Sequence, residues 1–217
     1  MLFFQLFSKS LHCIIKNSSS MTQQTSSLTH ENQDRYPPGD LAIWIFILAE
    51  LSVFAVFFAA YAFTRMNNVE LFNEHQQHLD TQAALINTLA LITSSYFVVR
   101  AVAAIRENSI RHCIHWLLAA IAMGGLFVAV KIMEYAHHFG EGINLSTNTF
   151  YMFYISLTFF HFMHVIMGMV ILGAVALKAH KGGYSASEHT GVETGASYWH
   201  MVDLVWLILF PLIYVMR

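Results

Sequence analysis

The sequence predicts an all-α membrane protein, a bundle of five transmembrane helices with its N-terminus in the cytoplasm and its C-terminus in the periplasm. Of the 217 residues, 56% are hydrophobic and only 11% are charged, whereas soluble domains average about 25% charged residues. Five apolar segments are each long enough to cross a bilayer, which takes about 20 residues in a helix. The polar connections between them are too short to form an extramembrane domain, so any function must reside in the bundle.

Residues 1–40 form a polar leader that we expect to be disordered. The first part of the leader contains two apolar patches separated by Ser8, Lys9 and Ser10, and neither patch is long enough to span a membrane. Their order also differs from that of a signal peptide, in which a charged start precedes a continuous apolar stretch. Since Met21 opens a uniformly polar stretch, we expect the mature protein to start there.

The membrane domain covers residues 41–217. Asp40 follows two prolines and a glycine that end any earlier helix, and we expect its side chain to cap the first span. The five predicted spans are residues 41–63, 82–104, 114–135, 149–177 and 198–216. Each is expected to be an unbroken helix, because backbone amides left unpaired in hydrocarbon are costly.

The Lys and Arg residues predict the orientation, because cytoplasmic loops carry the excess of positive charge. Eight of the eleven belong to the side that holds the N-terminus: Lys9, Lys16, Arg35, Arg100, Arg106, Arg111, Lys178 and Lys181. The other three, Arg65, Lys131 and Arg217, belong to the opposite side. Leaving out the first twenty residues removes two of the eight and does not change the predicted orientation.

Glu50 is expected near the middle of the first span. A charged group at this depth costs at least about 2.5 to 3.5 kcal/mol, so such groups usually have a partner or a task. His161 and His164 are three residues apart and therefore share one face near the middle of the fourth span. We expect Glu50 to contact one of these histidines. Two roles stay open for the carboxyl, namely helix packing and the handling of protons or coupling to a partner.

His200 and Asp203 repeat this spacing about one turn inside the cytoplasmic end of the predicted fifth span, where anchoring at the membrane interface explains them. Glu134 lies three residues after Lys131 at the outer end of the third span, and an intrahelical ion pair is the simplest interpretation. No residue is assigned a catalytic role. We expect one intramembrane polar network, structural or proton-related, that comprises Glu50, Glu134, His161, His164, His200 and Asp203.

The thirteen histidines raise the question of a haem or metal site. A haem held by two histidines needs them at matching depth on different helices, whereas His161 and His164 are expected about 10 to 15 Å from His200 along the bundle, at 1.5 Å per residue. Cys13 and Cys113 are too far apart in sequence to indicate a disulfide framework or a thiolate site. We therefore expect no metal and no cofactor. The net charge of −2 and the lack of a phosphate-binding loop exclude nucleic-acid and nucleotide chemistry.

The motifs of the five spans, taken in order, resemble subunit III of the haem-copper oxidases. They are Glu50 with Phe54, Phe57 and Phe58; Asn87-Thr88; Glu134-Tyr135; His161-x-x-His164-Val165-x-x-x-Gly168; and Tyr198-Trp199-His200-x-x-Asp203-x-x-Trp206. The resemblance runs from about Pro38 to Arg217. Mitochondrial members have seven spans, and this chain is similar to the short form that lacks the first two. Residues 148–169 and 193–214 resemble most closely the NorE-type protein encoded with nitric oxide reductase.

The resemblance implies a non-catalytic accessory subunit without redox centres, docked against a haem-bearing catalytic subunit that it stabilises or tunes. The expected partners are that subunit and membrane lipids, and the expected location is the bacterial inner membrane. Bound phospholipid is left open, because family members hold lipid in a cleft that the short form retains only in part. The alternative to the NorE-type role is subunit III of an aerobic cytochrome c or quinol oxidase. In either role the chain alone is expected to have no activity.

Two other classes of membrane protein are alternatives to an accessory subunit. A free-standing transporter or proton-conducting bundle would use Glu50, His161 and His164 as relay groups, but transporters commonly show paired repeats and broken helices, and neither is evident in the sequence. A membrane-bound metal hydrolase or oxygenase would need several histidines clustered at one face. The expected depths of the histidines argue against such a cluster.

Overall fold

The computed structural model describes residues 41–216, and all of their regular secondary structure is helical. The predicted polar leader, the possible start at Met21 and the predicted helix cap at Asp40 lie outside the described residues. The description below therefore concerns the membrane domain alone.

Five helices are long and apolar enough to cross a membrane, which confirms the predicted five-span, all-α fold class. They are α2 (Leu41–Asn67), α4 (Thr81–Arg106), α5 (Ile110–Gly140), α6 (Thr149–His180) and a last span made of α7 (Thr190–Phe210) followed by the π-helix η2 (Pro211–Val215). A short helix that the sequence did not predict, α3 (Val69–Gln76), lies in the connection between α2 and α4. The orientation in the membrane stays a prediction.

The spans extend beyond the predicted apolar segments, and α7 differs most. It begins at Thr190, eight residues before the predicted start. Its first turns are polar, and Glu193 there accepts a hydrogen bond from Arg106 at 2.7 Å. Hydropathy marks where a helix enters hydrocarbon, so it missed these polar turns. His200 and Asp203 consequently lie well inside the helix and not near its end.

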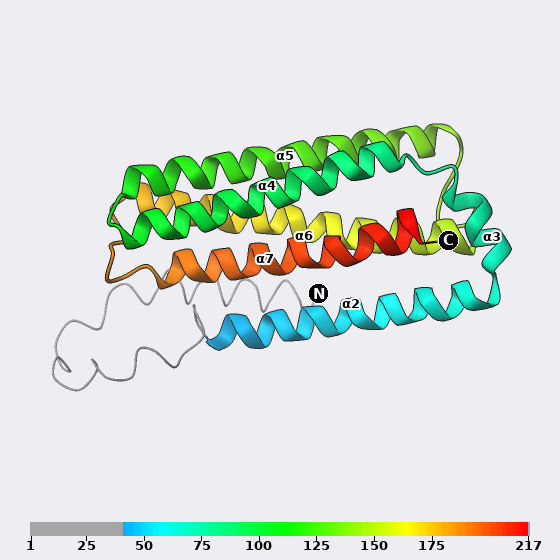
Figure 1. Cartoon of the computed structure of the whole chain (residues 1–217), viewed down its shortest axis with the longest axis horizontal. Helices are drawn as coiled ribbons and strands as arrows, with labels where there is room; N and C mark the ends of the chain where they lie inside the picture. The colour runs from blue at the N-terminus through cyan, green and yellow to red at the C-terminus, as the bar shows by residue number, and fades with distance from the viewer. Residues whose placement is uncertain (1–40, 217) are drawn as a thin grey trace. The chain divides into compact units, whose positions relative to one another are not determined.

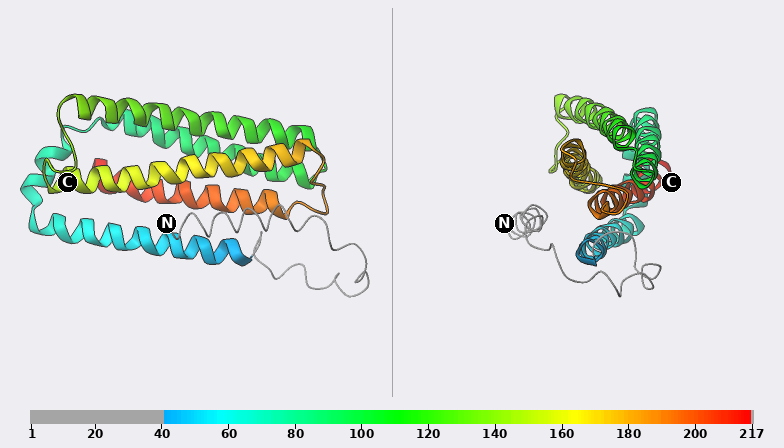
Figure 2. Two further views of the ribbon diagram at one scale, coloured as in Figure 1. Left: turned by 180° about the vertical axis from the view of Figure 1, so that it is seen from behind. Right: turned by 90° about the vertical axis from the view of Figure 1, so that its left-hand side faces the viewer.

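Helices α4, α5, α6 and α7 form a closed ring, and α2 packs against its outside (Figure 1, Figure 2). Around the ring, α4 packs against α5, α5 against α6, α6 against α7, and α7 against α4. Helix α2 meets the ring along one stripe of buried side chains, which are Ile47, Glu50, Phe54 and Tyr61. Their spacings of three, four and seven residues place them on one helix face. Most of the remaining surface of α2 is exposed.

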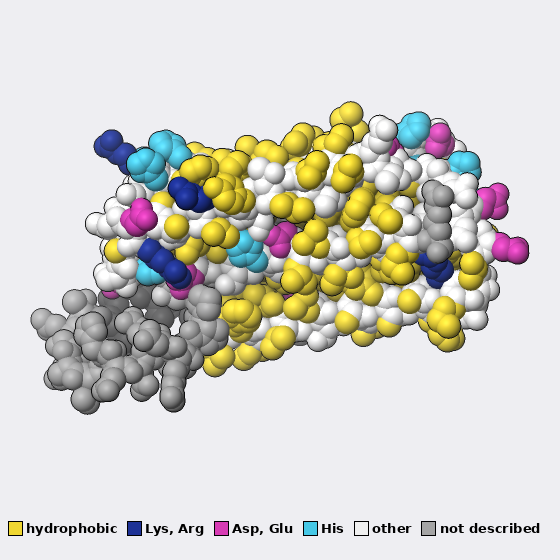
Figure 3. Space-filling view, in the orientation of Figure 1, with side chains coloured by type: hydrophobic (Ala, Val, Ile, Leu, Met, Phe, Trp, Pro, Cys, Tyr) yellow, Lys and Arg dark blue, Asp and Glu magenta, His cyan; other side chains and the backbone are white. Residues whose placement is uncertain are grey.

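The outer surface of the bundle is apolar along its length. Figure 3 shows hydrophobic side chains over the middle of the helices, with charged and histidine side chains gathered toward both ends. Large apolar side chains are exposed on every spanning helix, for example Ile45, Leu89, Ile132, Leu177 and Leu207. An apolar surface of this extent is typical of a membrane-facing protein.

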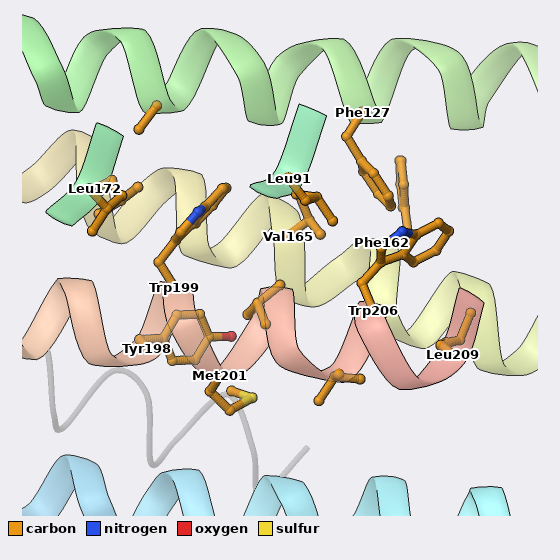
Figure 4. Packing of buried hydrophobic residues seen from close by; sticks show 14 of the residues in the cluster. Leu91, Phe127, Phe162, Val165, Leu172, Tyr198, Trp199, Met201, Trp206 and Leu209 are labelled. Carbon is orange, nitrogen blue, oxygen red and sulfur yellow. The ribbon is translucent and has the colours of Figure 1, made fainter. Parts of the chain in front are cut away.

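Two tryptophans of α7 fill the centre of the ring, and Figure 4 shows both indole rings directed from α7 toward the facing helices. Trp199 fits there because its neighbours lack side chains. A Cβ atom added to Gly124 of α5 or to Gly168 of α6 would lie 2.8 Å from the Trp199 ring. Trp206 donates a hydrogen bond from Nε1 to Oγ1 of Thr88 at 2.9 Å. The two rings therefore join α7 to α4, α5 and α6.

Candidate functional site

Glu50 of α2 and His164 of α6 form the first polar pair inside the bundle. Nε2 of His164 lies 3.1 Å from Oε2 of Glu50, and both side chains are buried. The sequence predicts that Glu50 contacts His161 or His164, and the structure confirms the contact with His164. The pair connects the outer helix α2 to the ring.

The surroundings of His164 determine how this pair shares a proton. Nδ1 of His164 lies 2.8 Å from the carbonyl oxygen of Phe160. A carbonyl oxygen only accepts hydrogen bonds, so Nδ1 carries a hydrogen and Nε2 is left to meet the carboxyl. The contact with Glu50 then needs one more proton, held either by the carboxyl or by the ring. The pair can exist as two neutral groups or as an ion pair without moving a heavy atom.

His161 lies next to this pair in sequence but packs in a different environment. Its ring lies against Trp206 with the centroids 5.2 Å apart, and it meets Phe127 edge-on at 5.7 Å. The side chain is fully buried, and neither ring nitrogen has a hydrogen-bond partner within residues 41–216. His161 thus packs as an aromatic ring and does not extend the Glu50–His164 pair.

Lys131 and Glu134 of α5 form a second buried pair. Nζ of Lys131 lies 3.0 Å from Oε2 of Glu134, and the side chains are 0% and 4% exposed. The predicted intrahelical ion pair is confirmed. The pair lies in the second half of α5, which continues beyond it to Gly140. The pair lies inside the protein, where each charge depends on its protein partners.

Two tyrosines complete this cluster. Tyr214 of η2 accepts a hydrogen bond from Nζ of Lys131 and donates one to Oε1 of Glu134, both at 2.7 Å. Tyr154 of α6 donates to the same carboxylate oxygen. Glu134 therefore receives donors from α5, α6 and η2, which satisfy both of its oxygens. We refer to Lys131, Glu134, Tyr154 and Tyr214 as the Lys131 cluster.

Aromatic rings surround the ammonium group of Lys131. Its Nζ lies between 5.3 and 5.6 Å from four ring centroids, which belong to Tyr135, Tyr154, Trp206 and Tyr214. A cation near the face of an aromatic ring is attracted by the ring quadrupole, more strongly where water is excluded. The rings therefore replace part of the hydration that Lys131 loses on burial.

The π-helix η2 carries Tyr214 into the Lys131 cluster. It starts at Pro211, which has no backbone N–H to donate to a preceding turn. Turns of π-helix are rare in proteins overall, and those that occur are often found at functional sites. Pro211 is the one signal in the sequence that could have indicated an irregular turn near Tyr214.

A third polar group lies between α4 and α7. Oγ of Ser95 lies 2.7 Å from Nδ1 of His200, and the same nitrogen lies 3.4 Å from Oδ2 of Asp203. The sequence predicts His200 and Asp203 as anchors near the membrane interface. Asp203 lies midway along the helical segment from Thr190 to Val215, and the depth of the two residues in the membrane stays a prediction. We refer to Ser95, His200 and Asp203 as the α4/α7 polar group.

The six candidate residues do not form the single network that the sequence predicts. They divide into the Glu50–His164 pair, the Lys131 cluster with Glu134, the α4/α7 polar group with His200 and Asp203, and the separate His161. Sequence reasoning missed Tyr154 and Tyr214 and did not link Ser95 to His200, because spacing along one helix does not reveal contacts between helices. Among the described residues, no three His, Cys, Asp or Glu side chains are grouped so as to hold a metal ion.

Comparison with known proteins points to one family. The family model described as cytochrome c oxidase subunit III matches residues 38–217. The chain is 34% identical over 177 residues to cytochrome c oxidase subunit 3 of Thermostichus vulcanus, covering 81% of this chain and 86% of that protein. It is 32% identical over 206 residues to cytochrome c oxidase subunit 3 of Synechocystis sp., covering 89% and 87%. It is 28% identical over 176 residues to quinol oxidase subunit 3 of Bacillus subtilis, covering 81% and 86%.

Proposed function

Since this chain belongs to the cytochrome c oxidase subunit III family, we propose that it serves a haem-copper terminal oxidase as an accessory membrane subunit. In this role it docks against the haem-bearing catalytic subunit and stabilises or tunes it. The observation that carries the proposal is the extent of the family match, which covers residues 38–217 and so includes all five spans. The relatives named above are subunits of cytochrome c or quinol oxidases.

The polar side chains of the bundle suit this role. The Glu50–His164 pair joins α2 to α6, and the Lys131 cluster joins α5, α6 and η2. Both sets connect helices that are distant in sequence, and both are buried. Such contacts hold a defined helix arrangement in a membrane, where apolar side chains alone discriminate poorly between lipid and protein.

The NorE-type assignment, which the sequence resemblance favours, becomes the alternative. None of the three relatives named above is described as a nitric oxide reductase protein. An accessory subunit of nitric oxide reductase would have the same physical role with a different catalytic partner. An experiment must therefore measure both reactions.

The proposed location is a bacterial inner membrane, in keeping with the bacterial origin of the relatives. Bound phospholipid belongs to the proposal as well, because α2 exposes large apolar side chains against which acyl chains can pack. The Glu50–His164 pair is proposed as a packing contact between helices that can also exchange a proton.

The decisive test is deletion of this chain in its host. Membranes of the deletion strain should consume oxygen more slowly and lose activity faster during turnover, with residual activity from the catalytic subunit. Reintroduction of the wild-type chain should restore both, and nitric oxide consumption should stay unchanged. A loss of nitric oxide reduction with normal oxygen consumption would favour the NorE-type role. Unchanged assembly and activity of both enzymes would contradict an accessory role.

A further inference from the structure

Among the residues that the structure describes, the α4/α7 polar group reaches the surface of the bundle near the middle of its length. His200 is 38% exposed and Asp203 13% exposed at the side chain, and Ser95 is half-buried. Asp203 lies midway along the last span, and Ser95 lies near the middle of α4. Figure 3 shows acidic and histidine side chains at the surface between α4 and α7, away from both ends. These groups therefore lie on the lateral surface of the bundle, away from both of its ends.

Apolar side chains border the polar group on both helices. Ile92 and Val99 precede and follow Ser95 by three and four residues, and Leu204 follows His200 by four. Positions at these spacings share one helix face. All three apolar side chains are exposed. The polar group is thus an island in a hydrophobic surface, which we call the α4/α7 face.

Other polar side chains on the lipid-facing surface are satisfied within their own helix. The hydroxyls of Ser52, Thr64 and Thr93 each donate to the carbonyl four residues earlier, at 2.7 to 2.8 Å. Such hydroxyls need no further partner in hydrocarbon. A carboxyl group has no hydrogen bond of this kind to make when it is ionised, so Asp203 differs in kind from them.

Asp203 keeps an unused acceptor. Nδ1 of His200 lies 2.7 Å from Oγ of Ser95 and 3.4 Å from Oδ2 of Asp203, and the tautomer of the ring decides which atom donates in these contacts. Neither Nε2 of His200 nor Oδ1 of Asp203 has a hydrogen-bond partner among the residues that the structure describes. An oxygen of an ionised carboxyl group only accepts, so the complementary surface must supply a hydrogen-bond donor to Oδ1 of Asp203.

We propose that the α4/α7 face is the surface against which a transmembrane helix of the oxidase's catalytic subunit docks, with a donor side chain of that helix meeting Asp203. The proposal rests on the accessory function proposed above and names the surface that carries it. The side chains of the partner helix that can supply this donor are Lys, Arg, Trp, Tyr and Asn. Ile92, Val99 and Leu204 provide the apolar rim.

Two other occupants fit the face less well. A second copy of this chain would bring two Asp203 carboxyl groups to the same contact, because a symmetric contact places the same patch on both sides. Lipid acyl chains offer no donor at this depth, since headgroups lie at the two interfaces. Both are nevertheless outcomes that the experiment below can detect.

Photo-cross-linking in the assembled oxidase tests the proposal. The amino acid p-benzoylphenylalanine is placed at Leu204 or Ile92 on the α4/α7 face, and at Met133 of α5 or Val56 of α2 as matched exposed controls. After illumination of native membranes, the two face positions should give an adduct with the catalytic subunit, and the two controls should not. Purification through a tag on the catalytic subunit, before illumination, shows whether the wild-type chain associates with it at all.

The remaining outcomes contradict the proposal in different ways. If only Met133 or Val56 gives adducts with the catalytic subunit, the docking surface lies elsewhere on the chain. The proposed accessory function is not contradicted by that result. Adducts of Leu204 with a second copy or only with lipid would reject the proposed occupant. If the wild-type chain does not co-purify with the catalytic subunit, the accessory function itself fails.

A pair of substitutions tests the polar contact. Asp203→Leu keeps the approximate size of the side chain and removes both acceptor oxygens, whereas Thr93→Val alters a residue of α4 whose hydroxyl is already satisfied within its own helix. The ratio of this chain to the catalytic subunit after detergent purification should fall about fivefold to twentyfold for Asp203→Leu, the range of a strong hydrogen bond between membrane helices. It should not change for Thr93→Val. An unchanged ratio for Asp203→Leu, with normal thermal stability of the isolated chain, would refute the polar contact.

Discussion

At the scale of single residues, the bundle handles buried polarity in two ways. Glu50 has one partner from another helix, His164, within an otherwise apolar setting. Glu134 receives donors from Lys131, Tyr154 and Tyr214. A proton shared in the first pair can neutralise both groups, whereas the Lys131 cluster contains enough donors to hold an ion pair away from water. Substitutions should therefore act differently at the two places.

Removal of one charge from the Lys131 cluster should cost more than removal of both. Glu134→Gln leaves a buried ammonium without its carboxylate, and Lys131→Met leaves a buried carboxylate without its ammonium. Each single change should lower the free energy of unfolding by about 3 to 5 kcal/mol. The double variant removes both charges and should be less destabilised than either single variant. Unfolding of the purified protein in detergent, followed by circular dichroism as dodecyl sulfate is added, measures the difference.

Glu141→Gln is the matched control, because Glu141 is half exposed just after α5 and its ion pairs with His137 and His138 reach solvent. Its effect should stay within about 0.5 kcal/mol. Strictly additive losses in the double variant would show that the two buried charges do not depend on each other.

At Glu50, the amide and alanine variants separate packing from proton chemistry. Glu50→Gln keeps the shape and a donor for Nε2 of His164, so it should change stability by less than about 1 kcal/mol, since hydrogen bonds between membrane helices average about 0.6 kcal/mol. Glu50→Ala also leaves a cavity and should cost about 2 kcal/mol or more. Thermal unfolding in detergent measures both. If Glu50→Gln keeps partner binding but impairs sustained turnover of the partner, the carboxyl has a protonic role. If neither variant changes stability, partner binding or turnover, the carboxyl is dispensable.

At the scale of helices, close approach depends on glycine opposite tryptophan. Gly124 and Gly168 lie on facing sides of Trp199, and neither position has room for a methyl group. The ring of α4, α5, α6 and α7 closes around this contact. The helices would otherwise have to separate to admit the indole.

Gly168→Ala should lower the free energy of unfolding by about 1 to 3 kcal/mol, the usual cost of overfilling a packed core. Gly125→Ala and Gly173→Ala place the same methyl group where no atom lies within 4 Å, so they should be neutral or slightly stabilising because alanine favours helix. Thermal unfolding of the three variants in detergent compares them directly. Equal stability of all three would mean that Trp199 moves freely and does not hold the ring together.

Hydropathy predicted the existence and order of all five spans, because a lipid-facing helix must be apolar along most of its length. It did not predict where α7 begins, since Glu193 is polar and is satisfied by Arg106 from another helix. It also missed α3, in which only two residues, Phe72 and Gln76, are buried. Short-range spacing predicted the Lys131–Glu134 pair and the approach of His164 to Glu50. Contacts such as that of Ser95 with His200 need the packed bundle to be seen.

At the scale of the whole molecule, an odd number of spans places the start of the first span and the end of the last span on opposite sides of the membrane. The positive charges lie mainly with the connection between α4 and α5 and the connection between α6 and α7. The connection that contains α3 and the one between α5 and α6 lie at the other end, as Figure 1 shows. The charge distribution thus predicts which end of the bundle faces the cytoplasm, namely the end with these two connections.

Reporter fusions test this orientation. Alkaline phosphatase, which is active only in the periplasm, should be active when fused after Gly142 and inactive when fused after Asn108. A green fluorescent protein fused to the N-terminus should be fluorescent, as expected in the cytoplasm. The opposite pattern would invert the bundle and leave its helix packing unchanged.

The position of Tyr214 has a consequence for how the protein is made. Lys131 and Glu134 leave the ribosome first, and Tyr214 follows Lys131 by 83 residues, which takes roughly 4 to 17 s at about 5–20 residues per second. During that interval the third span carries an ion pair whose last donor has not been synthesised. The nascent helices therefore cannot complete their mutual packing span by span. A chain that stops before Tyr214 lacks the hydroxyl that accepts from Lys131 and donates to Glu134.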